Sequence, residues 1–392
     1  MPSPVSLALV ALPAILLAGI FQVYIQPLLA AWGFYRAATV NYNNDYCKTV
    51  PQLKACEKII LHPDSGLLYL ACSIPSSRTH WTPAVGRLNE SGASFNDYVA
   101  TYDPKTAAIT KLKVVGFKST RGLSLHGMDV VHSSANPSEL FVYLVNHRAP
   151  IGAKAADVGA DSVIEIFKTT VGGKEMTHVK TVEDPIIATP NDVVGNPDGK
   201  SFYFTNDHGE YKAGHIRTYN LYSWAKETTV GYCDTDIGCI YAAQNMHANN
   251  GITRAPNGTV YVADSTSGGL SILEPQDDHT LVLTDIVPVD RALDNLFVDS
   301  EGHVWVAAFP DMHALLYKHF SNPAEAVSPT TVFRFSLNTG PDAVLGKKFK
   351  VEKMLEDDGK TISGTTSVVY DVKRNLLFMN GLASSHLTIC KL

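Results

Sequence analysis

A repeated pattern of turn and strand constrains the fold of this chain more than any other feature of its sequence. Six segments join a turn rich in Pro, Asn, Asp and Gly to an apolar stretch ending near Ala, Ser, Asn or Asp; they are residues 62–73, 136–146, 196–207, 255–265, 299–309 and 371–381. Gly and Asn or Asp supply the geometry of tight turns between adjacent strands. From Gly66 to Asn375 the turns recur every 62 residues or so, about the length of a four-stranded blade with long loops. We therefore predict an all-β, six-bladed β-propeller.

The N-terminus differs in composition from the rest of the chain. Residues 1–35 contain no charged side chain, and the stretch from Pro4 to Ala31 is almost wholly apolar and long enough to cross a bilayer. A retained membrane anchor, a cleaved secretion signal and a buried core helix are the three alternatives. We expect a hydrophobic helix that acts as anchor or signal in residues 1–40, followed by one propeller domain in residues 41–392. The propeller would then be lumenal, extracellular or secreted.

Two further features agree with the secretory pathway. Asn89 and Asn257 each begin a glycosylation acceptor triplet. The six cysteines are an even number and none is spaced as CxxC, which disfavours a zinc site. Cys233 with Cys239 could close a small loop and Cys47 with Cys390 could tie the ends of the folded part together, with buried free thiols as the alternative. The sequence leaves the pairing of Cys56 and Cys72 open.

Composition and missing motifs exclude several classes of function. The 392 residues include 32 basic and 38 acidic side chains, a formal net charge of −6, so we expect no nucleic-acid partner. The chain has no GxSxG elbow of a serine esterase and no HExxH zinc motif. A glycine-rich nucleotide-binding motif is also lacking.

Oxygen-bearing side chains recur at one phase of the repeat. Asn191, Asn250 and Asp294 each lie 8 residues before the turn glycine, Glu57 lies 9 before it, and His126 falls in roughly the same phase. The symmetry of a propeller would gather these side chains at one end of the central channel. The carboxylate and carboxamide groups, those of Glu57, Asn191, Asn250, Asp294 and Asn295, form a set of hard oxygen ligands that suits calcium. The alternative is that they are ordinary turn residues, but recurrence in four repeats favours a common site.

The same residues carry a family resemblance. The segments LHGMD (125–129), VNHR (145–148), TPNDVV (189–194), YFTNDH (203–208), ANNGIT (248–253) and LDNLFVD (293–299) resemble the paraoxonase/arylesterase family in that order. The likeness runs from Cys47 to the C-terminus. It implies a six-bladed, calcium-dependent hydrolase of lactones and aryl esters, with a hydrophobic N-terminal segment that is often retained. It also implies a Cys47–Cys390 disulfide that closes the propeller.

The resemblance assigns roles to single residues. Glu57, Asn191, Asn250, Asp294 and Asn295 would hold one catalytic calcium ion, which polarises the carbonyl of a small lactone or ester substrate. His126, assisted by His147 behind it, would deprotonate the attacking water, with Asp294 as the competing base. Two other functions stay open: a metal-independent propeller of the strictosidine-synthase type and a non-catalytic, membrane-bound binding propeller.

The chain departs from the family pattern at two positions. The family has an acidic pair where this chain reads Glu57-Lys58, and the second acid, with the Asp of the PND motif, binds a structural calcium ion. An ammonium group cannot ligate calcium. Our hypothesis is that Lys58 pairs with Asp192 in place of that second ion. The other departure is Phe309, where the family usually has His-Pro, which predicts a more apolar pocket wall; Asp207 and His208 are expected at the pocket rim.

Overall fold

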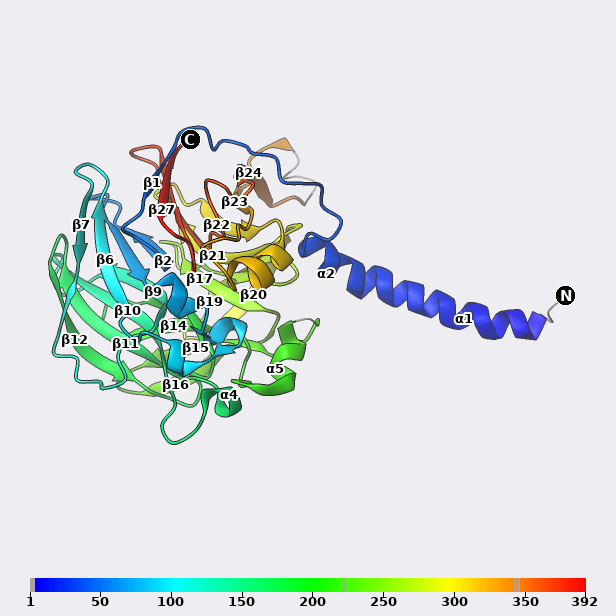
Figure 1. The fold of residues 1–392 in the computed structure, drawn as a ribbon, viewed down its shortest axis with the longest axis horizontal. Helices are drawn as coiled ribbons and strands as arrows, with labels where there is room; N and C mark the ends of the chain where they lie inside the picture. The colour runs from blue at the N-terminus through cyan, green and yellow to red at the C-terminus, as the bar shows by residue number, and fades with distance from the viewer. Residues whose placement is uncertain (1–3, 222, 342, 344–345) are drawn as a thin grey trace.

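In the residues that the structure describes, 4–221, 223–341, 343 and 346–392, six β-sheets of four or five strands follow an apolar helical segment (Figure 1). The structure is a computed structural model. The inner strands of the six sheets contact one another in a closed ring, in the order β2, β9, β13, β17, β21 and β25. The six-bladed propeller predicted from the turn repeat is therefore confirmed.

The first three blades follow one another along the chain. Blade 1 consists of β2 (Cys56–Leu61), β3 (Leu68–Cys72), β6 (Tyr98–Asp103) and β7 (Ala108–Lys111). Blade 2 consists of β9 (Leu125–His132), β10 (Glu139–Arg148), β11 (Asp161–Thr170), β12 (Glu175–Val182) and β8 (Lys113–Val115). Blade 3 consists of β13 (Pro190–Gly195), β14 (Ser201–Asn206), β15 (Thr228–Asp234) and β16 (Gly238–Met246).

The other three blades complete the ring. Blade 4 consists of β17 (Asn249–Arg254), β18 (Val260–Asp264), β19 (Gly269–Pro275) and β20 (Leu281–Pro288). Blade 5 consists of β21 (Ala292–Val298), β22 (Val304–Phe309), β23 (Thr330–Leu337) and β24 (Phe349–Asp357). Blade 6 consists of β25 (Ser367–Asp371), β26 (Leu376–Asn380), β27 (Leu387–Lys391) and β1 (Cys47–Val50). Short helices lie in the loops, among them α3 (Pro75–Arg78), α4 (Ala155–Val158), α5 (Gly214–Leu221) and the π-helix η4 (Ala314–His319).

The hydrophobic core is divided among the interfaces between blades. On β3, Leu68 and Leu70 pack toward blade 6, whereas Tyr69 and Ala71 pack toward blade 2. Successive side chains of a strand point to opposite faces, so a strand covered on both faces must be apolar at every position. This explains why the repeated segments read as continuous apolar runs rather than as alternating patterns.

The turns between the first and second strands use the residues that the repeat singled out. Gly66, Gly199, Gly258 and Gly302 all have positive φ angles, between 71° and 96°, and Asn375 has φ 53°. Glycine adopts this conformation without strain, and Asn tolerates it better than most residues.

The two ends of the chain meet in blade 6. Strand β1, from the N-terminal side, pairs antiparallel with the C-terminal β27, and Cys47 lies opposite Cys390 in the register. A disulfide joins these two cysteines, and a second joins Cys233 to Cys239. The ring is therefore closed by main-chain hydrogen bonds and by a covalent bond.

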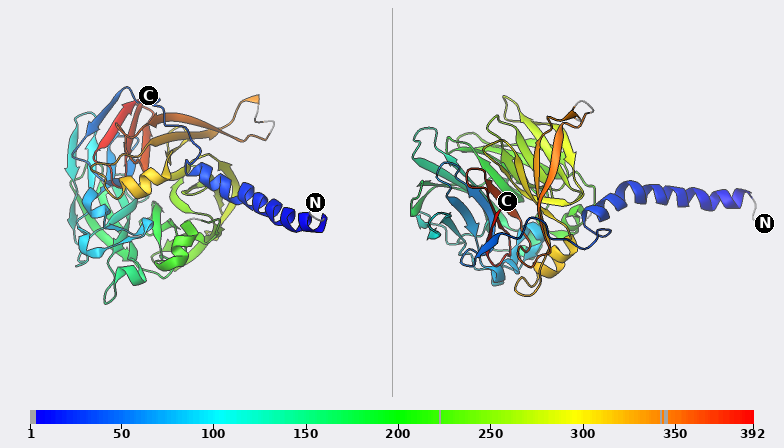
Figure 2. Two further views of the ribbon diagram at one scale, coloured as in Figure 1. Left: turned by 45° about the vertical axis from the view of Figure 1, so that its right-hand side comes forward. Right: turned by 90° about the horizontal axis from the view of Figure 1, so that it is seen from above.

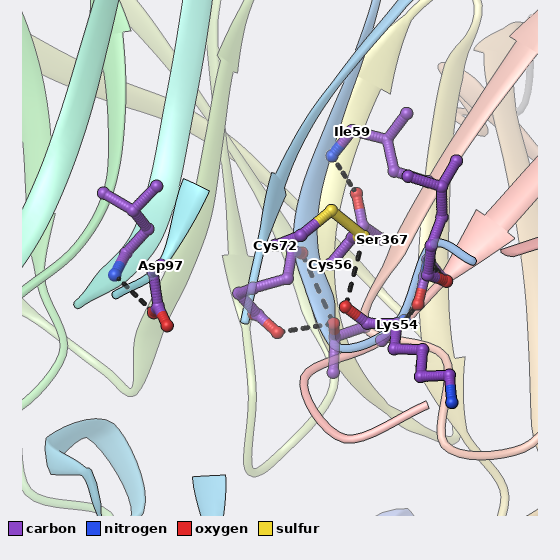
Figure 3. Close-up of a disulfide and its surroundings, with 12 residues drawn as sticks. Lys54, Cys56, Ile59, Cys72, Asp97 and Ser367 are labelled. Atoms are coloured by element: carbon purple, nitrogen blue, oxygen red, sulfur yellow. Dashed lines mark hydrogen bonds between the residues drawn. A yellow bond between two sulfur atoms is a disulfide. The ribbon is translucent and has the colours of Figure 1, made fainter. Parts of the chain in front are cut away.

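The third disulfide, which the sequence left open, joins Cys56 to Cys72 within blade 1 (Figure 3). Its two cysteines are directly opposite in the β2–β3 pair, and both are fully buried. Next to it the main-chain N–H of Ile59 donates to Ser367 Oγ at 3.0 Å, which links blade 1 to blade 6. All six cysteines are thus paired.

The apolar N-terminal segment forms a helix that projects away from the propeller (Figures 1 and 2). It comprises α1 (Pro4–Ile20), a π-helical turn η1 (Phe21–Ile25) and α2 (Gln26–Ala31); residues 1–3 of the expected 1–40 segment lie outside the described residues. The 20 residues Leu12–Ala31 are long and apolar enough to cross a membrane, and only 6% of this span is buried. Ala31 and Trp32 are buried, and Trp32 packs with Phe309 and Met312 of blade 5 and its following loop.

Candidate active site and family

The predicted site residues lie near the beginning of the inner strands. Glu57, His126, Asn191 and Asn250 are each the second residue of their strand, and Asp294 is the third residue of β21. In all five blades the pairing register of the inner strand shifts at this point, which marks a β-bulge. The structure therefore brings these residues from five blades to one end of the central channel.

The bulges explain how the side chains of two consecutive residues can both point toward the channel. In a regular strand, neighbouring side chains point to opposite faces, whereas a bulge inserts one extra residue and turns the strand locally. Two layers result. We call the first the upper ring: Glu57, His126, Asn191, Asn250, Asp294 and, in blade 6, Thr366. The residues that follow form the lower ring: Lys58, Gly127, Asp192, Gly251, Asn295 and Ser367.

A cavity lies above the upper ring. Its empty volume is about 750 Å³, a figure that includes open solvent, and all six upper-ring residues line it. The opposite wall is apolar and includes Phe309, Met312, Leu315, Phe320 and Leu382. The same wall packs against Trp32 at the base of the N-terminal helix. The cavity thus combines a polar floor with an apolar wall, and Phe309 lies where the sequence predicted it.

Three oxygen atoms of the floor have unused capacity to bind a cation. Asn191 Oδ1, Asn250 Oδ1 and Asp294 Oδ1 are buried, and none finds a hydrogen-bond partner in the described part of the chain. Burying a polar atom without a hydrogen-bond partner is unfavourable. Three such oxygens on one cavity floor indicate a site for a ligand that they can bind. An oxygen-only donor set without sulfur fits a hard cation such as calcium.

The surroundings of the two carboxyl groups of the floor disfavour their charged forms. Burial raises the pKa of Glu57 to about 7, although hydrogen bonds from Thr366 and Asn295 oppose the shift. Burial and the neighbouring Glu57 hold the pKa of Asp294 well above its usual range. Burial is the largest cause of both shifts because it disfavours the charged form of a carboxyl group, and a bound cation would oppose it.

Thr366 and Asn295 hold the Glu57 carboxylate from two sides. The Thr366 hydroxyl donates to Oε2 at 2.7 Å, and Asn295 Nδ2 donates to Oε1 at 3.0 Å. Asn295 Oδ1 faces the other way and accepts from Lys58 at 3.3 Å, so Asn295 orients Glu57 in this structure and does not line the cavity. Thr366 was not among the predicted site residues. It lies 9 residues before Asn375, the same phase as Glu57, so the repeat contained the signal.

The two predicted histidines lie one behind the other. His126 lines the cavity with its Nε2 atom 3.7 Å from Glu57 Oε1, and the His147 ring lies edge-on behind it with 5.3 Å between ring centroids. His147 Nδ1 is 2.8 Å from Ser162 Oγ. Burial and the charge of Arg78 lower the pKa of His147 to about 3, and burial together with His147 holds the pKa of His126 well below its usual range. Both rings are therefore neutral near pH 7.

Asp207 and His208, expected at the rim, both line the cavity. Asn191 Nδ2 donates to Asp207 Oδ2 at 3.3 Å, a contact that turns Asn191 Oδ1 away from Asp207. Burial raises the pKa of Asp207 to about 6. Arg217, near Asp207, donates to the Ala84 carbonyl at 2.9 Å. The sequence pattern did not reveal Arg78 or Arg217, because both come from loops that the repeat does not position.

Lys58 and Asp192, predicted as a pair, are in contact in the lower ring. Lys58 Nζ lies 2.5 Å from Asp192 Oδ2, and both side chains are almost completely buried, with 2% and 0% exposed. The position that would need a second acid for another cation is therefore filled by an ammonium group.

Comparison with known proteins places the chain in a family. The arylesterase family model matches residues 88–392. Human serum paraoxonase/arylesterase 2 is 26% identical over 243 residues, which are 61% of this chain and 62% of that protein. Serum paraoxonase/arylesterase 1 of Rattus norvegicus is 24% identical over 255 residues, 64% of this chain and 68% of that protein. A PQQ-bound aldose sugar dehydrogenase from Streptomyces coelicolor shares the fold alone: its TM-score is 0.50 at 11% identity, and the match covers 91% of this chain and 98% of that one. Because the family model spans more than half of the chain, the protein belongs to the arylesterase family, the family of the paraoxonases, as a divergent member.

Proposed function

We propose that this protein is a calcium-dependent hydrolase of lactones and aryl esters. The observation that carries the proposal is the set of three buried oxygens without partners, on Asn191, Asn250 and Asp294, beside the Glu57 carboxylate on one cavity floor. The family supports a hydrolytic enzyme, and the apolar wall opposite the floor suits the hydrocarbon part of an ester.

Calcium fits this donor set better than other common metals. The candidate ligands are Glu57, Asn191, Asn250 and Asp294, with Asn295 joining them if its amide turns. Two carboxylates would balance the charge of one divalent ion, and flexible oxygen coordination is typical of calcium. When bound, calcium supplies a Lewis acid that polarises the substrate carbonyl and stabilises the negative charge that develops on its oxygen.

His126 is the proposed general base. It lines the cavity, and its lowered pKa keeps the ring neutral and able to accept a proton from water at neutral pH. The same low pKa makes it a weak base, so we propose that His147, held by Ser162, lies behind it to share the proton. Asp294 is the competing base because its unpartnered Oδ1 belongs to the same floor.

The test is a substrate panel with and without calcium. Purified full-length protein should hydrolyse some of a set of γ- and δ-lactones and aryl esters, lose turnover in EDTA and regain it when calcium is restored. Magnesium, which prefers stricter geometry, should restore less. Full turnover in EDTA would reject the calcium mechanism and favour a metal-independent propeller enzyme; no turnover with any substrate would favour a binding propeller.

We also propose that the N-terminal helix attaches the protein to a membrane of the secretory pathway. The exposed apolar helix, the disulfides and the exposed side chains of Asn89 and Asn257 are compatible with that compartment. Glycans on Asn89 and Asn257 would show as a mass loss after enzymatic deglycosylation, and the loss should be absent from an Asn89→Gln/Asn257→Gln variant.

A further inference from the structure

Lys58 is a buried lysine at the centre of the lower ring. Its ammonium group has three N–H donors and three acceptors: Asp192 Oδ2 at 2.5 Å, Asn295 Oδ1 at 3.3 Å and the Leu296 carbonyl at 3.5 Å. Lys58 belongs to blade 1, Asp192 to blade 3, and Asn295 and Leu296 to blade 5. One side chain therefore joins inner strands that are not neighbours in the ring.

The acceptors of Lys58 are themselves tied to other strands. Asp192 Oδ2 also accepts from the main-chain N–H of Ile252 in blade 4 at 3.0 Å. Asn295 Nδ2 donates to the Glu57 carbonyl at 3.1 Å, which links blade 5 to blade 1. The network thus spans blades 1, 3, 4 and 5 and holds the strand that carries Glu57.

The rest of the lower ring leaves room for this network. A Cβ atom on Gly127 would lie 2.4 Å from Asp192 Cα, and one on Gly251 would lie 2.6 Å from Asn295 Cα. Glycine at these two positions lets the neighbouring inner strands approach at the level of Asp192 and Asn295. The acidic charge that remains in this layer, Asp192, contacts the Lys58 ammonium through Oδ2, while its Oδ1 is buried without a hydrogen-bond partner in the described residues.

We propose that Lys58 is a built-in cation that cross-links the inner strands across the channel, so that the fold of the propeller needs no metal ion in the lower ring. A divalent ion could make the same bridge, but its occupancy would follow the free ion concentration. A covalently attached ammonium is present at any calcium concentration. Folding would then not depend on metal binding. Calcium in the upper ring would take part in the reaction, while Lys58 stabilises the fold.

The first arm of the test measures thermal stability in EDTA. Lys58→Met leaves Asp192 buried and unpaired, and it should lower Tm by roughly 5 to 10 °C. Lys54→Met is the matched control, because Lys54 is exposed and four residues away; its Tm should stay within about 1 °C of the wild type. Lys58→Met/Asp192→Asn should recover most of the loss, because the unpaired charge is gone. If Lys58→Met alone does not fold, the double variant still decides the question.

The second arm counts calcium by elemental analysis after dialysis. The wild type should hold one calcium ion per chain. Lys58→Glu places a second carboxylate beside Asp192, so this variant should hold two. Added calcium should raise its Tm by more than it raises the Tm of the wild type. The count of one rests on the proposed function, whereas the stability arm does not. If the wild-type protein holds no calcium, the proposed calcium-dependent function is rejected. The Tm values alone then decide whether Lys58 cross-links the inner strands. Two calcium ions in the wild type, a Tm for Lys58→Met within about 1 °C of the wild type, or a double variant no better than Lys58→Met would overturn the proposal.

Discussion

At the scale of single residues, the candidate site contains two kinds of group: candidate ligands of a cation, and groups that orient those ligands. Asn191 and Asp294 offer unpartnered oxygens, while Asp207, Thr366 and Asn295 hold their neighbours by hydrogen bonds. Removing a ligand should therefore weaken metal binding, whereas removing the base should leave the metal bound and slow the reaction.

Asp294→Asn and His126→Gln distinguish these roles. We expect Asp294→Asn to lose calcium affinity together with turnover, because it removes one of two carboxylate charges. His126→Gln should keep calcium and lower kcat by about 10²-fold or more, the usual contribution of a general base. Calcium titration by calorimetry and lactone kinetics measure both, with exposed His313→Gln as the control. Near-normal kcat in His126→Gln, with loss of turnover but not of calcium in Asp294→Asn, would assign the base to Asp294.

The repeat predicted five of the six upper-ring residues, all but Thr366, because residues at the same position of each repeat come together around the axis of a propeller. It could not predict which way an amide points, so Asn295 entered the ligand set although its Oδ1 faces Lys58. Arg78, whose charge lowers the pKa of His147, comes from the helix α3 in a long loop. The path of such a loop depends on tertiary packing that no local pattern records.

At the scale of strands, the β-bulges of the inner strands place two layers of side chains in the channel. The alternation of side chains along a strand does not reveal a bulge in the sequence, because the inserted residue is of no particular type. Glycine is the one indirect sign, because Gly127 and Gly251 occupy the second bulge position where blades 1, 3 and 5 have Lys58, Asp192 and Asn295.

Gly251→Ala tests whether close strand packing supports the site. The new Cβ would lie 2.6 Å from Asn295 Cα and 2.7 Å from the Asp294 carbonyl oxygen, both main-chain atoms that cannot move independently. We expect a loss of about 2 kcal/mol or more in the free energy of unfolding and weaker calcium binding. Gly340→Ala is the control, because its nearest atom is the side-chain oxygen of Asn338 at 3.2 Å. Equal unfolding midpoints in urea for both variants would contradict the close packing.

A histidine pair joins the ends of β2 and β9 far from the upper ring. His62 Nε2 and His132 Nε2 are 2.8 Å apart; the Ser65 N–H donates to His62 Nδ1 at 3.3 Å, and His132 Nδ1 lies 3.1 Å from the Pro137 carbonyl. These contacts require His62 Nε2 to donate to a neutral His132. Burial and His132 lower the pKa of His62.

The pair should make stability depend on pH. The unfolded chain, with an ordinary histidine pKa, binds a proton more readily than folded His62 does, so this contribution is complete above about pH 6.5 and is lost as the pH falls toward the lower folded value. His132→Asn should reduce the fall in Tm between pH 7.5 and 5.5 by about 1 to 2 °C. The matched variant His313→Asn should keep the wild-type slope, and identical slopes for all three proteins would refute this origin.

At the scale of the whole molecule, closure of the ring depends on residues from both ends of the chain. The turn repeat predicted the number of blades, and the family resemblance implied the Cys47–Cys390 bond. The fifth strand of blade 2 was not predictable, because β8 belongs to the connection from blade 1 and pairs parallel to β12 outside the repeat. The path of a connection between blades depends on how the folded blades pack, which the repeat does not record.

The disulfides allow closure to be tested against a matched control. Cys47–Cys390 spans 343 residues and Cys233–Cys239 spans 6. In the chain-entropy model these loops correspond to about 6 and about 2 kcal/mol of stabilisation, because a long loop loses more conformational entropy when it is closed in the unfolded state. Replacing each pair by alanine and measuring unfolding in urea should show the larger loss for Cys47/Cys390. An equal or smaller loss would mean that the β1–β27 hydrogen bonds and blade packing close the ring without help from the covalent bond. A larger loss would mean that the bond stabilises the closed ring beyond these contacts, by lowering the conformational entropy of the unfolded chain.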